Sequence, residues 1–267
     1  QLMEQFRERL TDQFREGLGS RVVWLTSRCV PEKRRSSYAV FIPIIQRILN
    51  INISASTAES RSRLRTKLER LYNTGTTDWI LSIDEMQAYF ESLLFVDQQL
   101  HDKIRFLSYE QIQRQTFVAI RDLLVTVARS KPIVLALDDL LWIDDVSKNL
   151  ITFLLDIFLD TPIFLLCLSH SQDWWLREYA MRIVPDHYES IVLEWMSLEE
   201  SNEFLDHLLP GADLPEALKT LILRRANGNP FHLSQIVKLL RADHILVKHR
   251  DQWIVTVDID LISIPNT

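Results

Sequence analysis

Short apolar runs along the chain predict a set of strands. Residues 133–137 are five apolar residues in a row. This run is too short for a helix and too continuous for a half-exposed strand, so it predicts a buried parallel strand. Similar runs predict further strands at residues 21–28, 163–168 and 191–193.

Between these runs, apolar residues recur at helical spacing. At the start of the chain Leu2, Phe6, Leu10, Phe14 and Leu18 recur every fourth residue, which predicts a helix with one buried stripe. The same periodicity predicts helices at residues 57–72, 84–95, 109–129, 146–159, 214–226 and 231–240.

The last third of the chain carries local signals for helix ends and a hairpin. Ser197 with Glu200 three residues later predicts a capping box at a helix start. Residues 244–248 and 254–257 predict a two-stranded wing after the final helix.

Composition limits the class of protein. The chain has 267 residues, 47% hydrophobic and 25% charged, which is typical of a globular protein with one large or two small cores. Its longest apolar run, residues 157–168, is interrupted by Asp160, so we expect no membrane span. Cys29 and Cys167 fit no metal or redox motif, and we expect reduced thiols in a cytoplasmic protein.

Charge argues against nucleic acid as a general partner. The net charge is -6, which disfavours broad binding to a polyanion. The predicted helix at residues 57–72 is nevertheless basic, and its cations favour a solvated or salt-bridged face over a nucleic-acid contact. These cations are Arg61, Arg63, Arg65, Lys67 and Arg70.

Two carboxylates follow the predicted buried strand directly. Asp138 and Asp139 stand at its carboxyl end, and in open α/β sheets ligands bind in the crevice beyond the strand tips. Placing both carboxylates beside apolar residues is costly unless a cation or hydrogen-bond donors meet them. The pair therefore suggests a magnesium and phosphate site, with a solvated acidic turn as the structural alternative.

The extension Asp-Asp-Leu-x-Trp-x-Asp-x-x-Ser makes the pattern more specific. Together with the preceding strand, it resembles the Walker B motif of signal-transducing P-loop ATPases of the STAND type, within the AAA+ group. The resemblance implies ATP and Mg²⁺ as cofactors. It further implies that Asp138 holds the metal, that Asp139 polarises the attacking water, and that Trp142 and Asp144 shape the turn.

Other positions match the same family with varying fidelity. Tyr38 opens a segment that lies beside the nucleotide pocket in the family, and Asn229-Pro230 falls within a Gly-Asn-Pro-Phe motif whose proline packs on the adenine. Ordinary helix capping is the alternative for Pro230. Ser171 stands where the family often has a phosphate-sensing Arg. A Ser cannot supply that charge, so His170 is a candidate substitute, although a lone His is more often structural.

The phosphate loop Gly-x-x-x-x-Gly-Lys-Ser/Thr is absent, because none of the five glycines is followed by Lys. The first residues resemble the family sequence just downstream of that loop, so we expect the chain to begin past it and to be inactive alone. The expected fold is α/β, a P-loop NTPase-like three-layer parallel sheet lacking its phosphate-loop strand over residues 1–194. A helical and winged-helix lid follows over residues 195–267.

The resemblance implies an ATP-binding regulatory ATPase module of a larger signalling or transcription-regulatory protein. Its expected partners are ATP or ADP, attached effector and sensor domains, and a second copy through an incomplete sheet edge. Two alternatives stay open. One is a nucleotide-free interaction scaffold. The other is a DNA-binding winged helix in residues 213–257, which carry seven Lys or Arg against four Asp or Glu. Because residues 231–240 offer one Lys and no Arg, a lid role is favoured there.

Overall fold

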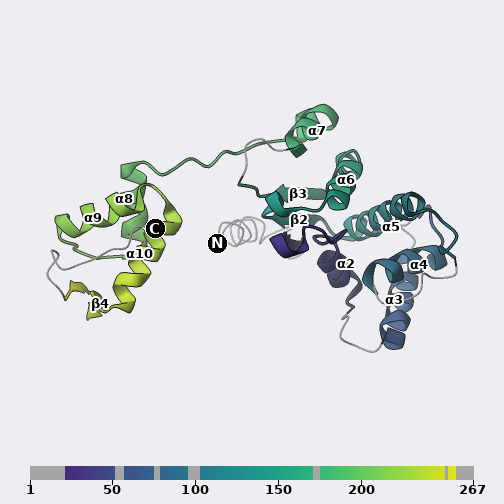
Figure 1. Ribbon diagram of the computed structural model, residues 1–267, viewed down its shortest axis with the longest axis horizontal. Helices are drawn as coiled ribbons and strands as arrows, with labels where there is room; N and C mark the ends of the chain where they lie inside the picture. The colour runs from purple at the N-terminus through teal and green to yellow at the C-terminus, as the bar shows by residue number, and fades with distance from the viewer. Residues whose placement is uncertain are drawn as a thin grey trace. The chain divides into compact units, whose positions relative to one another are not determined.

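The computed structural model describes residues 22–51, 57–74, 79–95, 103–170, 175–249 and 252–256 (Figure 1). The chain divides into two compact units, Gln1–Ser190 and Ile191–Thr267, and each is described by itself. The helix expected on Leu2 to Leu18 lies outside the described residues.

The first unit is built on a parallel three-stranded sheet in the order β1-β2-β3. Its strands are β1 Val23–Arg28, β2 Ile133–Asp138 and β3 Ile163–Cys167. The first five residues of β2 are buried, because β2 is paired on both sides and packed on both faces. The expected buried parallel strand is therefore confirmed, as are strands at 21–28 and 163–168 with slightly shorter bounds.

Helices pack around this sheet and extend into a helical group. Figure 1 shows α3, α4 and α5 side by side, and consecutive members of this group contact one another. Capping boxes at Ser82 and Ser108 start α4 and α5. The helices are α2 Ile42–Leu49, α3 Thr57–Tyr72, α4 Ile83–Leu94, α5 Tyr109–Ser130, α6 Asp145–Leu154 and α7 Trp175–Ile183, with 3₁₀ turns at Pro31–Lys33, Leu140–Trp142, Ile157–Leu159 and Pro185–His187.

Carboxylates neutralise much of the basic helix α3. Arg63 lies 2.5 Å from Glu59, Arg61 lies 3.4 Å from Glu91, and Arg65 pairs with Asp84 and Glu69. The salt-bridged face expected for this helix is therefore the arrangement found for these three arginines.

Two expectations about secondary structure need correction, and one helix was not expected. No strand forms at residues 191–193, whose side chains are 77%, 56% and 73% exposed. A strand requires a hydrogen-bonded neighbour, and among the described residues none pairs with this segment. The helix expected at 146–159 ends at Leu154 and is followed by a separate 3₁₀ turn, a common way for a helix to finish. Helix α7 was not expected.

The second unit is a group of three helices followed by an antiparallel hairpin. Its core contains Leu205, Leu218, Ile222 and Leu233. Ser197 and Glu200 form the expected capping box, and its hydrogen bonds lower the pKa of Glu200. The elements are α8 Leu198–Leu208, α9 Glu216–Ala226, α10 Pro230–Ala242, β4 Leu246–His249 and β5 Gln252–Val255.

None of the helices in the described part of the chain is long and apolar enough to cross a membrane.

Candidate functional site

Three adjacent strands bring their following residues together at the carboxyl edge of the sheet. Asp138 is the last residue of β2, and Asp139 follows it. Parallel register places Arg28, the last residue of β1, directly opposite Asp138. His170 follows the end of β3 by three residues, which brings it to the same edge.

Each carboxylate oxygen of Asp139 has a side-chain nitrogen close to it. The Arg28 guanidinium lies 2.5 Å from Oδ2, and His170 Nε2 lies 3.3 Å from Oδ1. The Asp139 side chain is 16% exposed, whereas that of Arg28 is 68% exposed. The hydrogen bond to Asp139, and then the charges of Asp139 and Asp138, raise the pKa of Arg28.

Asp138 is less fully engaged than its neighbour. Its Oδ1 accepts the backbone N–H of Asp139 at 2.9 Å, while its Oδ2 lies 3.8 Å from Arg28 Nε. The side chain is 30% exposed. Because 3.8 Å is too long for a hydrogen bond, Oδ2 of Asp138 is the oxygen at this edge best able to accept a cation.

The chain turns sharply after β2. Asp139 has φ 54° and ψ 44°, the left-handed conformation that Asp tolerates better than most residues. The 3₁₀ turn Leu140–Trp142 follows, and the half-buried Trp142 packs against the main core. This conformation directs the chain away from the sheet immediately after the two carboxylates.

Asp144 fixes the position of the turn through four hydrogen bonds. It caps α6 by accepting the Ser147 backbone N–H at 2.9 Å and the Ser147 hydroxyl at 2.6 Å. It also accepts the backbone N–H groups of Tyr38 and Ala39, each at 3.1 Å. Asp144 is 4% exposed and Ser147 is fully buried, so this carboxylate ties the turn after β2 to the segment before α2.

Tyr38 lies in the core beside this clamp. Its side chain is 8% exposed and packs edge to face on Phe117, with ring centroids 6.1 Å apart. Burial raises the pKa of its phenol, and a hydrogen bond with Thr116 partly opposes that rise. The structure thus brings Tyr38 to Asp144, and a nucleotide contact by Tyr38 stays a prediction.

The pKa of the Cys29 thiol is raised by burial and by the negative charges at this edge. Cys29 follows β1, is 5% exposed, and its pKa is raised to about 12. Burial is the largest cause, followed by the negative charges of Asp144, Asp139 and Asp138. Because the Cys29 thiol stays protonated near neutral pH, the carboxylate oxygens are the candidate metal ligands at this edge. The described residues contain no group of three or more side chains suited to a metal ion.

The other expected site residues belong to the second unit or lie outside the described residues. In the second unit, Asn229 caps α10 by accepting the backbone N–H groups of Phe231 and His232, and Pro230 is the first helical residue. Gly228 precedes them with φ +74°, and a Cβ there would lie 2.5 Å from the backbone oxygen of Met196. Ser171 lies outside the described residues.

Sequence reasoning missed Arg28 as a site residue. The strand itself was predicted, but the sequence does not show which strand it pairs with, and only that pairing places Arg28 beside Asp138 and Asp139. The position of Arg28 at the end of a predicted strand could have indicated it, because in a parallel sheet the last residues of neighbouring strands meet at one edge.

A parallel sheet with paired carboxylates at the end of its central strand, flanked by helices, is consistent with an α/β fold of the P-loop ATPase kind. The AAA ATPase domain family matches residues 2–166, and the chain belongs to this family. The first unit is thereby a P-loop ATPase-related module. No curated protein and no solved structure matches the chain.

Proposed function

We propose that this chain is the ATP-binding regulatory module of a larger signalling or transcription-regulatory protein, of the STAND type, in which nucleotide state acts as a switch. One observation carries the proposal. In a chain of the AAA ATPase family, Asp138 ends the central strand and Asp139 follows it at the carboxyl edge of the sheet, where open α/β sheets commonly bind ligands.

The two carboxylates have different roles in this proposal. Asp138 holds Mg²⁺, directly or through water, with the Oδ2 that its neighbours leave available. Mg²⁺ is commonly held by one or two carboxylates together with substrate phosphates, so a pair of acidic residues suffices. The bound ion would supply positive charge at the phosphates. Asp139 orients the attacking water and accepts its proton.

The ion pair between Arg28 and Asp139 defines the state of the site before ATP binds in this proposal. A carboxylate that already accepts a hydrogen bond from a guanidinium is a weaker acceptor for a water molecule. Arg28 is 68% exposed, so it can leave Asp139 at modest cost. We therefore propose that Arg28 moves away from Asp139 when the site engages ATP.

Tyr38, Asn229 and Pro230 complete the proposed nucleotide contacts, and His170 replaces the charged sensor that Ser171 cannot supply. The second unit acts as the lid, with its hairpin β4–β5 as a winged-helix-like wing. Helix α10 carries one Lys, Lys238, and one Arg, Arg241 in its last turn, and this small positive charge favours a lid over a DNA-reading helix.

A nucleotide-free scaffold is the second candidate, and one specific observation favours it. These 267 residues contain no phosphate loop, whose backbone N–H groups and Lys make the main phosphate contacts. The ATP proposal therefore requires a loop supplied by residues upstream of Gln1. If an upstream segment without that motif completes the sheet, the scaffold is the better description.

Thermal unfolding with millimolar ATP and Mg²⁺ tests the proposal. We expect no change in the melting temperature of the 267-residue chain and a clear rise for a form extended upstream by about 30 residues. A ligand at a hundredfold excess over its Kd stabilises the native state by about 2.7 kcal/mol. An extended form that carries the loop but shows no rise would support the scaffold instead.

A further inference from the structure

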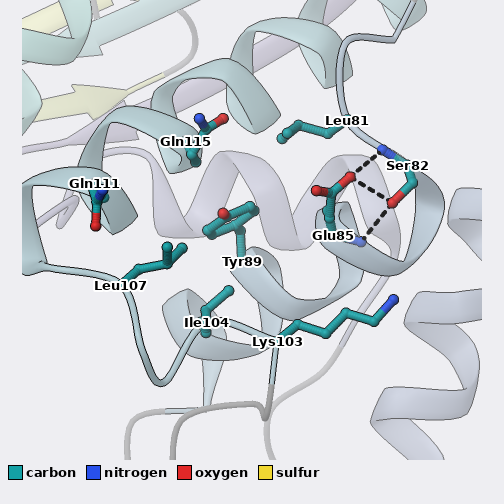
Figure 2. Close-up of a pocket in the computed structure, with 9 residues that line it drawn as sticks. All are labelled: Leu81, Ser82, Glu85, Tyr89, Lys103, Ile104, Leu107, Gln111 and Gln115. Carbon is teal, nitrogen blue, oxygen red and sulfur yellow. Dashed lines mark hydrogen bonds between the residues drawn. The ribbon is translucent and has the colours of Figure 1, made fainter.

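A cavity of about 600 Å³ lies in the helical part of the first unit, and the proposed ATP site does not use it (Figure 2). It is lined by α4, by the segment that precedes α5, and by the first two turns of α5. Its volume falls within the range of about 300 to 1,000 Å³ that is usual for small-molecule sites.

One wall of the cavity is apolar and well packed. Leu81 is 6% exposed and Ile104 1% exposed, and Leu107 lies beside them in the lining. Figure 2 shows the ring of Tyr89 between Leu107 and Glu85. A ligand with an aromatic or branched apolar body can therefore remove this wall from water.

A tyrosine hydroxyl that lacks a hydrogen bond from the described residues also lines the cavity. Tyr89 is 4% exposed, yet no described residue forms a hydrogen bond with its phenol. The side-chain amide of Gln115, also in the lining, likewise has no hydrogen bond within the described part of the chain. Both groups can accept a hydrogen bond from a ligand.

Glu85 supplies the charge. Its Oε2 accepts the Ser82 backbone N–H at 2.8 Å and the Ser82 hydroxyl at 2.6 Å, which lowers the pKa of Glu85. Its Oε1 takes no hydrogen bond from a described residue. Lys103 also lines the cavity, but its Nζ lies 2.7 Å from Asp84. The charge left for a ligand is therefore negative.

We propose that this cavity binds a small organic cation, a primary ammonium group on an aromatic or branched apolar body. The ammonium lies at Glu85 Oε1, and the Tyr89 hydroxyl and the Gln115 amide offer further hydrogen-bond acceptors in the same lining. The apolar body packs on Leu107 and Ile104. This site is separate from the proposed nucleotide site and does not depend on ATP binding.

Tryptamine is a suitable probe, with indole-3-propionate as its anionic counterpart. We expect saturable binding of tryptamine to the 267-residue chain by calorimetry and by ligand-observed NMR. The anionic counterpart should bind at least about tenfold more weakly, because it places a carboxylate beside Glu85.

Two conservative variants address the polar contacts. Glu85→Gln should weaken tryptamine binding about tenfold or more, while Gln at this position still completes the capping box of α4. Tyr89→Phe keeps the ring and should weaken binding about threefold to tenfold. Glu110→Gln is the matched control, because it removes an equal charge from an exposed position of α5 outside the lining.

Leu107→Trp fills the cavity and should abolish binding without altering Glu85. The proposal is overturned if tryptamine shows no saturable binding, or if the anionic counterpart binds equally well. It is also overturned if Glu85→Gln behaves like Glu110→Gln, or if Leu107→Trp binds tryptamine as the unmodified chain does.

Discussion

The guanidinium of Arg28 lies 2.5 Å from Oδ2 of Asp139, joining residues that are 111 positions apart in the chain. Parallel pairing of β1 with β2 produces this contact, because it aligns the ends of both strands. The carboxylate proposed to orient water is therefore neutralised by its own protein in this arrangement.

Arg28→Gln tests whether this ion pair restrains hydrolysis. In the extended, ATP-hydrolysing form we expect faster single-turnover phosphate release, because Oδ2 of Asp139 loses its guanidinium partner. An exposed ion pair is worth up to about 1 kcal/mol, which limits the gain to about fivefold. Arg34→Gln, on the neighbouring exposed loop, is the control and should change nothing. A large fall in rate for Arg28→Gln would instead mean that Arg28 contacts the phosphates.

Asp144→Ala tests the clamp between the turn and the segment before α2. The change removes a helix cap and leaves several buried donors without an acceptor. We expect the free energy of unfolding, measured by urea titration, to fall by about 3 kcal/mol or more. Asp145→Ala removes the same charge from a side chain that is 92% exposed, and it should change stability by less than about 0.5 kcal/mol. Equal effects of the two changes would contradict the clamp.

We expect the 267-residue chain to self-associate through the outer edge of β3. Among the described strands β3 pairs only with β2, and Phe164 on β3 is 53% exposed. Unpaired edges and exposed apolar side chains promote association. We expect concentration-dependent dimers or larger species in sedimentation velocity, reduced by Phe164→Lys and absent from the form extended upstream. Phe231→Lys, at a 65% exposed position in the second unit, is the control. A monomeric 267-residue chain would contradict this prediction.

The raised pKa of Cys29 predicts low thiol reactivity in the native state. With its pKa at about 12 rather than 9.0, the thiol at pH 8.5 carries about 10³-fold less thiolate than an ordinary cysteine. Alkylation of a Cys167→Ala variant, which leaves Cys29 as the single thiol, should be correspondingly slow when folded. The rate should rise about tenfold per pH unit up to about pH 12, while the protein stays folded. Labelling in urea supplies the unfolded reference, and similar rates in both states would refute the burial argument.

The sequence predicted those elements whose signals lie within a few consecutive residues. The apolar run before Asp138 allowed β2 to be identified, and Ser197 with Glu200 allowed a helix start to be identified, because each signal is complete within a few residues. Pro230 shows the same locality, since the capping alternative for it follows from the helix that it begins.

Features that depend on pairing between distant segments were not predictable in this way. Arg28 reaches Asp139 only because two strands far apart in sequence share a register. The strand expected at residues 191–193 failed for the same reason: apolar composition does not provide a hydrogen-bonding neighbour. The cavity beside Tyr89 depends on how α4 and α5 pack, which the periodicity of either helix leaves open.

The central claim is that Asp138 and Asp139 have distinct roles in ATP hydrolysis. The direct measurement compares Asp138→Ala and Asp139→Asn in the extended form, with nucleotide affinity from calorimetry and phosphate release from single-turnover kinetics. Asp138→Ala should weaken magnesium-dependent binding as well as turnover. Asp139→Asn should leave ATP bound and slow hydrolysis by roughly 10² to 10⁴, the usual contribution of a positioned general base. Hydrolysis at the unmodified rate by Asp139→Asn would contradict the role of Asp139, and unmodified behaviour of both variants would contradict the site itself.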